Sequence, residues 1–265
     1  MEKFIIWRGV LAGAIAGVLA FIWAKIFVEP VIGRAIDFED GVGTARAALE
    51  HAHGGHSHSH GGEGAEITRT VQSTIGMGFG VLAFSVAMGV LLAVVFVVAY
   101  GRTNLSVRAL AALSAGGMLV SLWIVPALKY PPNPPAVSLD ETINQRTLLY
   151  VLLVALSVAL FVAAVYLGRR LVPRLGAWNA TLAATGAYVV AIAVVYLVLP
   201  TIDETPGPVV DEAGAIVFPG FPADDLYEFR LYSLGTQVVM WTTIGLVFGA
   251  MVSRLLEAKR EPVTA

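Results

Sequence analysis

Five histidines, the residues of this 265-residue chain best suited to binding a metal, lie within ten consecutive positions. They are His51, His53, His56, His58 and His60, separated by glycine, serine and alanine. Neutral imidazole is a good ligand for divalent late first-row metals, and small intervening residues allow several rings to close around one ion. Residues 51–60 are therefore predicted to form a flexible metal-collecting tract. The alternative is a solvated linker, because a histidine-rich tract is a compositional signal only.

Catalytic chemistry is not indicated elsewhere in the sequence. The chain has no cysteine, which removes disulfides, thiolate metal ligands and iron–sulfur sites together. It also contains no GxxxxGK[ST], HExxH or GxSxG motif. We therefore expect neither an enzyme nor an organic cofactor, and no nucleic acid as a partner.

The composition is typical of an integral membrane protein. Hydrophobic residues make up 57% of the chain and charged residues 14%, and a water-soluble globule could not easily bury so much apolar surface. A bilayer core of about 30 Å requires about 20 apolar residues per helix. We therefore expect an all-α membrane protein, a six-transmembrane-helix bundle that forms a single domain, 1–265. The expected spans are 4–28, 70–100, 106–128, 147–168, 177–199 and 231–254.

The charges differ between the two sides of this expected bundle. The side with both termini holds ten basic and three acidic residues, whereas the opposite side holds seven basic and sixteen acidic residues. By the positive-inside rule we expect both termini to be cytoplasmic and the histidine tract to lie outside, as in an inner-membrane protein. Two outward loops are expected, 29–69 with the tract and the acidic 200–230. Acidic loops alone would mean little, but together with histidines they favour a cation role.

A weak internal repeat predicts three helix hairpins, each closed outside by a proline-led loop. The apolar runs end at Pro30, Pro126 and Pro200, and the returning helices open with Arg69, Arg146 and Arg230. Carboxylates near these arginines are Glu66, Glu141 and Glu228. We expect each arginine to pair with a carboxylate and so to clamp its loop over the bundle. The alternative is that each arginine simply extends to the lipid headgroups.

Polar residues are rare inside the expected spans. Those that could line an ion path are Gln72, Thr74, Thr236 and Gln237. Hydroxyl and amide groups can replace part of an ion's water shell, although hydrogen bonding between helices is their more common use.

Glycines in three of the spans predict close helix packing. They are Gly9, Gly13 and Gly17 in the first, Gly76, Gly78 and Gly80 in the second, and Gly245 and Gly249 in the sixth.

Several segments in order along the chain carry a family likeness. They are Val28-Glu29-Pro30-Val31-Ile32, Tyr130-Pro131-Pro132-Asn133-Pro134-Pro135, and Phe221-Pro222 with Leu226-Tyr227-Glu228-Phe229-Arg230. In these segments the chain resembles the CbtA family, described as probable cobalt transporter subunits. The resemblance implies a divalent metal as cargo and a small one-helix CbtB-type subunit as partner, within membrane lipid.

The resemblance and the histidine tract together predict a membrane component of cobalt or nickel uptake. The tract would collect divalent metal on the extracytoplasmic side. Two alternatives remain open: a metal-binding accessory or sensor subunit of a separate transporter, and a structural membrane subunit whose histidine tract is incidental.

Overall fold

The fold is almost entirely helical in the computed structural model, which describes residues 2–52, 71–135, 137, 141–202 and 204–257. The α-helices are α1 (Glu2–Trp23), α2 (Glu29–Ala52), α4 (Met77–Ala99), α5 (Val107–Leu119), α6 (Val125–Lys129), α7 (Ile143–Val198) and α8 (Ala223–Glu257). Three π-helical turns, Ala24–Val28, Gln72–Gly76 and Val120–Ile124, adjoin these helices. Five of the described helical stretches are long and apolar enough to cross a membrane, as expected of a multi-pass membrane protein.

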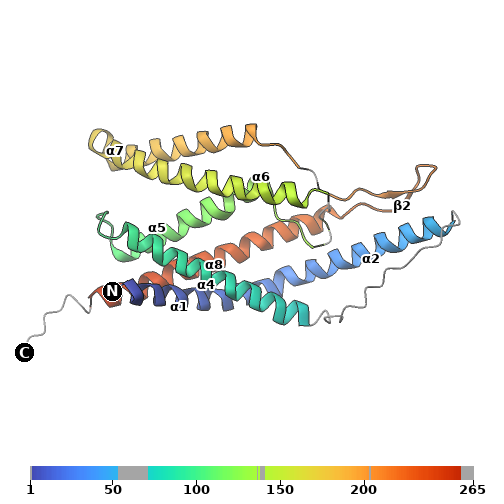
Figure 1. Cartoon of the computed structure of the whole chain (residues 1–265), viewed down its shortest axis with the longest axis horizontal. Coiled ribbons are helices and arrows are strands. Elements are labelled where there is room, and N and C mark those ends of the chain that lie inside the picture. Colours follow the sequence, from blue (N-terminus) through green and yellow to red (C-terminus); the bar gives the residue numbers. More distant parts are fainter. Residues whose placement is uncertain (1, 53–70, 136, 138–140, 203, 258–265) are drawn as a thin grey trace, which may run out of the picture.

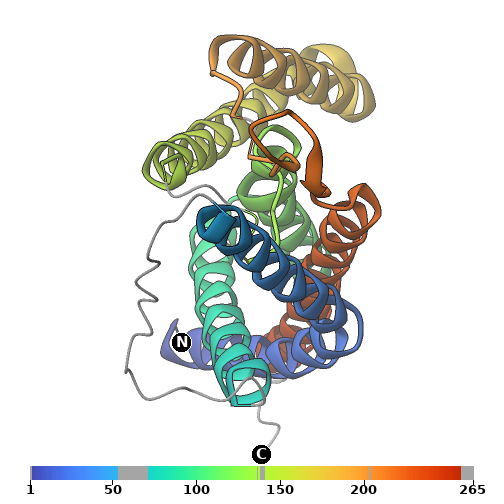
Figure 2. The same cartoon turned by 90° about the vertical axis from the view of Figure 1, so that its right-hand side faces the viewer.

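Four helices form the main body of the bundle. α1 packs along α4 and α8, and α5 packs along α8, so that α8 lies against both α1 and α5 (Figures 1 and 2). The core between these helices is built from large side chains on α4 and α8 and from alanines on α1. Its fully buried members include Ala12, Ala16, Leu92, Phe96, Ile244 and Phe248.

Glycine spacing predicted this packing correctly in α1 and α8. A Cβ atom built on Gly13 would lie 2.5 Å from the carbonyl oxygen of Ser85, so the α1 and α4 backbones can touch only because the side chain is absent. Gly245 and Gly249 similarly face α5. The prediction was wrong for Gly76 and Gly80, since a Cβ at either position would meet nothing within 4 Å.

α7 is a pair of antiparallel arms rather than one rod. Gly176 has φ 74° and ψ 165°, a backbone conformation outside the helical region that L side chains rarely adopt, and the chain reverses there (Figure 1). The reversal falls between the expected spans 147–168 and 177–199. Both arms lie to one side of the main body, beside α6 (Figure 2).

The expected loop 29–69 is helical over its first part, because α1 continues through a π-helical turn into α2. Pro30 therefore does not open a loop, as the hairpin repeat predicted, but lies within α2. A proline lacks an N–H group and its ring crowds the carbonyl four residues earlier, which in this case belongs to the π-helical turn. Pro126 likewise follows the π-helical turn Val120–Ile124. In both places the wider turn allows the helix to continue past the proline.

The expected acidic loop 200–230 contains a small hairpin that the all-α prediction missed. β1 (Val209–Val210) pairs antiparallel with β2 (Ile216–Phe218). Gly214, with φ 79°, and the Asp211 carboxylate, which accepts from the Ala215 N–H at 2.8 Å, form the turn. α8 then begins at Ala223, earlier than the expected residue 231. Asp224 and Asp225 in its first turn favour this start, because their charges complement the positive end of the helix dipole.

Candidate functional site

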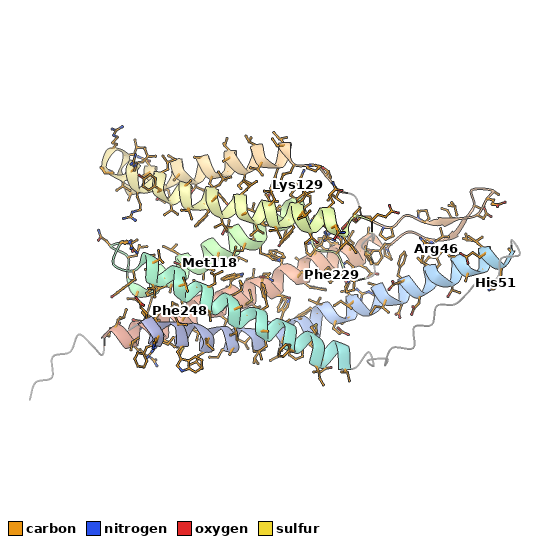
Figure 3. All side chains as sticks on the ribbon, in the orientation of Figure 1. Arg46, His51, Met118, Lys129, Phe229 and Phe248 are labelled. Carbon is orange, nitrogen blue, oxygen red and sulfur yellow. The ribbon has the colours of Figure 1, made fainter. Side chains whose placement is uncertain are left out.

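The structure describes one of the five candidate metal ligands. His51 lies exposed in the last turn of α2, at the far end of that helix from the bundle (Figure 3). The other four, His53, His56, His58 and His60, lie outside the described residues. Among the described residues, no group of three or more His, Asp or Glu side chains is arranged to hold a metal ion.

A single long helix carries the start of this tract. The stretch Glu2–Ala52 has 51 residues, which at about 1.5 Å per residue gives a length of about 75 Å. This is more than twice the roughly 30 Å hydrocarbon core of a bilayer. α1 is the apolar part, while α2 carries most of the charged side chains. α2 also extends past the ends of α4 and α8 (Figure 1).

α2 is braced against the start of α8 and the β-hairpin. The Arg34 guanidinium donates to the carboxylates of Asp225 and Glu228, each at 2.5 Å. Next to this pair, the Phe38 ring meets the Phe221 ring edge-on with centroids 5.0 Å apart. The base of the extended helix is thus fixed to the bundle by a charged and an aromatic contact.

We call the end of the bundle from which α2 and the β-hairpin extend the outer end, because the charge pattern predicts that it faces outward. Its second feature is a cluster of polar side chains around Glu204. This carboxylate is almost completely buried, yet one oxygen accepts from the Thr142 hydroxyl at 2.7 Å. The other oxygen accepts from the Asn133 amide at 3.1 Å and from the Arg146 guanidinium at 2.5 Å. A buried carboxylate is stable only with such donors around it. We call Asn133, Thr142, Arg146, Glu204 and Arg230 the outer polar cluster.

Two of the three predicted clamp arginines meet in the outer polar cluster. Arg146 also donates to the carbonyl oxygen of Pro131 at 3.0 Å, which places its planar fork between two loops. Arg230 donates to the Asn133 side-chain oxygen at 3.0 Å, while its Nε is buried without a hydrogen-bond partner in the described structure. The third, Arg69, lies outside the described residues.

The carboxylates in these contacts differ from those that the sequence suggested. Arg146 pairs with Glu204, which is 58 residues away, rather than with Glu141, which is much nearer in the sequence. Glu228 bonds to Arg34 of α2 instead of supporting Arg230. Carboxylates close in the sequence are therefore not the partners of these arginines, because loops far apart in the chain come together at the outer end of the bundle.

The segment that follows Pro126 also lies beside the end of α7 and Pro200. The Tyr130 hydroxyl donates to the Pro200 carbonyl at 2.8 Å, and the Lys129 ammonium donates to the Tyr196 carbonyl at 3.0 Å. Burial raises the pKa of Tyr130 above its ordinary value. Figure 3 shows Lys129 beside α7, at the outer end of that hairpin.

The candidate ion-path residues are not gathered around a common channel in the described structure. Thr74 is exposed, and the Thr236 hydroxyl donates to the Tyr232 carbonyl of its own helix at 3.0 Å. Gln237 is half-buried, and the side chain of Gln72 lies outside the described part of the structure. An ion path through these four residues stays a prediction.

Lys25 makes a polar contact that the sequence did not predict. Its ammonium donates to the side-chain oxygen of Ser73 at 3.0 Å and to the Ser73 carbonyl at 3.3 Å. The bond joins two π-helical turns, Ala24–Val28 and Gln72–Gly76. A lone lysine near the end of an apolar span was the available signal, since such a charge needs a partner.

Comparison with known proteins gives one result. A family model described as "Probable cobalt transporter subunit (CbtA)" matches residues 2–253, a range that runs from α1 into the last turns of α8. No curated protein and no solved structure matches the chain.

Proposed function

The chain belongs to the CbtA family of probable cobalt transporter subunits, and from this premise we propose that it collects cobalt or nickel on residues 51–60 during uptake. The metal is cargo in this proposal, and no catalytic step is involved. The observation that carries it is the position of His51. The tract begins at the exposed tip of a helix about 75 Å long, far from the apolar surfaces of the bundle.

The proposed arrangement in the membrane has six spans. The two arms of α7 each cross the bilayer, which with the other four long helices gives an even number of crossings. The start of α1 and the end of α8 lie at the same end of the molecule (Figure 1), next to Arg102, Arg108 and Arg254. By the positive-inside rule this end faces the cytoplasm, and the histidine tract and the acidic hairpin face outward from the inner membrane.

The outer polar cluster would fix the loops that roof the bundle. Arginine repels a metal cation, so we assign Arg146 and Arg230 to loop positioning rather than to metal binding, and extend the same role to Arg69. Arg146 joins the loop before α7 to the loop after it. These contacts would hold the outer end in one shape while metal passes from the tract.

A small one-helix CbtB-type subunit is the proposed partner in the transporter complex. The family description already names a subunit, which implies that transport involves a second chain. One observation favours an accessory or sensor role for this chain alone: Thr74 is exposed on the surface of the bundle, so it does not line an interior path for an ion.

Reconstitution into liposomes tests the proposal. Cobalt uptake would be measured for the chain alone and with the one-helix partner, using wild-type protein and a variant whose residues 51–60 are replaced by a Gly/Ser linker. We expect the linker variant to fold normally and to lose high-affinity cobalt binding measured by calorimetry. Unchanged binding would show that the tract is incidental. Uptake that requires the partner would identify this chain as an accessory subunit.

The same binding experiment has a characteristic pH dependence. Imidazole has a reference pKa of about 6.5 and must be neutral to coordinate a metal. Cobalt capture by the tract should therefore weaken steeply from about pH 7 to about pH 5.5, while a site made of carboxylates would persist into more acidic solution. Binding that stays flat over this interval would place the metal site away from the histidines.

A further inference from the structure

A groove at the basic end of the bundle lies between α5 and α8. Its floor is formed by Gly245, Gly249 and Ala250 of α8, Leu246 lines one wall, and Arg108 and Arg254 stand at its side. Its volume is about 350 Å³. This basic end of the bundle is the end where α1 begins and α8 ends (Figure 1).

The two floor glycines explain why the groove is narrow and apolar. A Cβ atom at Gly245 would lie 2.9 Å from the Ala115 Cβ, and one at Gly249 would lie 3.2 Å from the Ala111 Cβ. The two helices therefore approach closely along a line of small residues. Leu246, which is exposed, rises beside this line and forms an apolar wall.

The charge at the groove is strongly one-sided. Arg108 and Arg254 are both exposed, and no ion pair in the described part of the chain involves either guanidinium. The acid nearby is Glu257, whose carboxylate accepts from the Ser253 hydroxyl at 2.6 Å. Another described cation near this end of α8 is Arg8, whose guanidinium bonds to the Met251 and Phe4 carbonyls. Two guanidiniums thus face the groove without a protein anion.

A second hollow adjoins the groove on the other side of Arg108. Its volume is about 680 Å³, and it lies between residues 100–107 and the end of α8. Its lining is more polar and includes Asn104 and Thr103. The Thr103 hydroxyl is buried without a hydrogen-bond partner in the described structure. A buried hydroxyl without a partner is costly, which indicates a polar group from outside the chain.

We propose that this pair of hollows is a binding site for one anionic phospholipid. The phosphate lies between Arg108 and Arg254, a glycerol-type headgroup reaches the Thr103 hydroxyl, and an acyl chain lies along the glycine floor. Guanidinium groups bind phosphate oxygens through paired hydrogen bonds. Basic pockets between membrane helices are known to suit anionic headgroups. Arginines that merely extend into the headgroup layer would attract any anionic lipid by charge alone, and all arginines at that level would do so to a similar extent.

The first experiment measures phospholipid retained by the purified chain in detergent, using native mass spectrometry. Phosphatidylglycerol and phosphatidylcholine with the same acyl chains would be titrated against wild type, Arg108→Gln, Arg254→Gln and the double variant. Each substitution should weaken phosphatidylglycerol binding about fivefold, the effect expected for one basic residue near a membrane surface, and leave phosphatidylcholine unchanged.

The matched control is Arg174→Gln, an exposed arginine in the turn region of α7 that does not line either hollow. Melting temperatures without added lipid establish that all variants fold. If Arg174→Gln weakens binding as much as Arg108→Gln and Arg254→Gln, the effect is general surface charge and the site proposal is overturned.

A second experiment separates a lipid from a free anion. Ala250→Phe should fill the floor while leaving both arginines in place, and it should weaken long-chain phosphatidylglycerol more than a six-carbon-chain analogue. Inorganic phosphate should stabilise the wild-type protein less than phosphatidylglycerol at equal concentration. Equal stabilisation by inorganic phosphate, or no effect of Ala250→Phe on long-chain lipid, would contradict the proposed occupant.

Discussion

The main body and the α7 hairpin are both built from apolar helices, but they are held together in different ways. In α8, 44% of the most apolar stretch is buried, whereas in α7 the figure is 11%. The body helices meet through glycines that bring backbones into contact, as at Gly13 against Ser85. By contrast, a Cβ atom built on Gly186 of α7 would meet nothing within 4 Å. Glycine contacts inside α7 are looser, since a Cβ on Gly168 would lie 3.2 Å from the Ala184 Cβ, whereas the close contacts of Gly13 are with backbone atoms.

The largest expected effect comes from filling a glycine of the main body. Gly13→Leu must separate α1 from α4, because a Cβ there would lie 2.5 Å from the Ser85 carbonyl oxygen and 2.7 Å from the Val86 Cα. Overpacking of this kind should lower the free energy of unfolding by about 3 kcal/mol. Unfolding by a denaturing detergent, followed by circular dichroism, measures the change.

Gly186→Leu in α7 is the matched control. The position is exposed and helical, so the substitution should change the free energy of unfolding by less than about 0.5 kcal/mol. Comparable losses for the two variants would remove the distinction between a glycine-packed body and an open hairpin.

Sequence spacing predicted these regions unequally. The repeat Gly9, Gly13, Gly17 identified a packed helix face correctly, because a spacing of four residues places glycines on one side of a helix. The reversal of α7 between the fourth and fifth expected spans was also located well. Nothing in the glycine pattern distinguished Gly13 from Gly80, since only the neighbouring helix decides whether the missing side chain matters.

The next effect in size concerns how the α7 hairpin is attached at its outer end. Arg146→Ala leaves the buried Glu204 carboxylate without its charged partner, and breaking a buried ion pair from one side costs about 3 kcal/mol in the interior. Arg146 is partly exposed, so we expect about 2 kcal/mol, still well above a surface pair. Hydrogen exchange should show faster exchange in α7 and little change in α1 and α4.

Arg34→Ala is the control for this variant. Arg34 also bonds to carboxylates at 2.5 Å, but its side chain is 43% exposed, so its removal should cost less than about 1 kcal/mol. Arg146→Lys adds a functional test, because lysine lacks the planar fork that reaches both Glu204 and Pro131. If Arg146→Lys takes up cobalt as wild type does, the clamp idea fails and anchoring at the headgroups suffices.

The site was less predictable than the fold, for identifiable physical reasons. An arginine at each returning helix was visible in the sequence, but its partner depends on how loops far apart in the chain come together, as with Glu204. The helical form of α2 is not predictable from the sequence, because a proline ordinarily ends a helix, whereas a π-helical turn accommodates Pro30. The β-hairpin had a signal in the two β-branched runs flanking Gly214, which the helical composition obscured.

The smallest expected effect lies inside the hairpin, where the comparison can be made sharper. The Tyr188 hydroxyl and the Ser157 hydroxyl are 2.8 Å apart and buried, so they join the two arms of α7. Tyr188→Phe keeps the ring, and with it the edge-on contact to Phe161 at a centroid distance of 5.7 Å, and removes only the hydrogen bond. Such bonds between membrane helices contribute about 0.6 kcal/mol on average, so we expect a loss of about 0.5–1 kcal/mol.

Tyr166→Phe is the control for this last prediction, because Tyr166 is exposed and its ring lies 4.7 Å from the Arg170 guanidinium, a contact that phenylalanine retains. It should leave the unfolding free energy unchanged. A loss at Tyr188 close to that of Gly13→Leu would mean that the arms depend on one polar contact. No loss at all would mean that the buried apolar cluster shared by the arms, which includes Leu153 and Ile192, holds them without it. A small loss confined to Tyr188 fits a hairpin whose arms need little internal fixing, because lipid covers most of their surface and the outer polar cluster holds their ends.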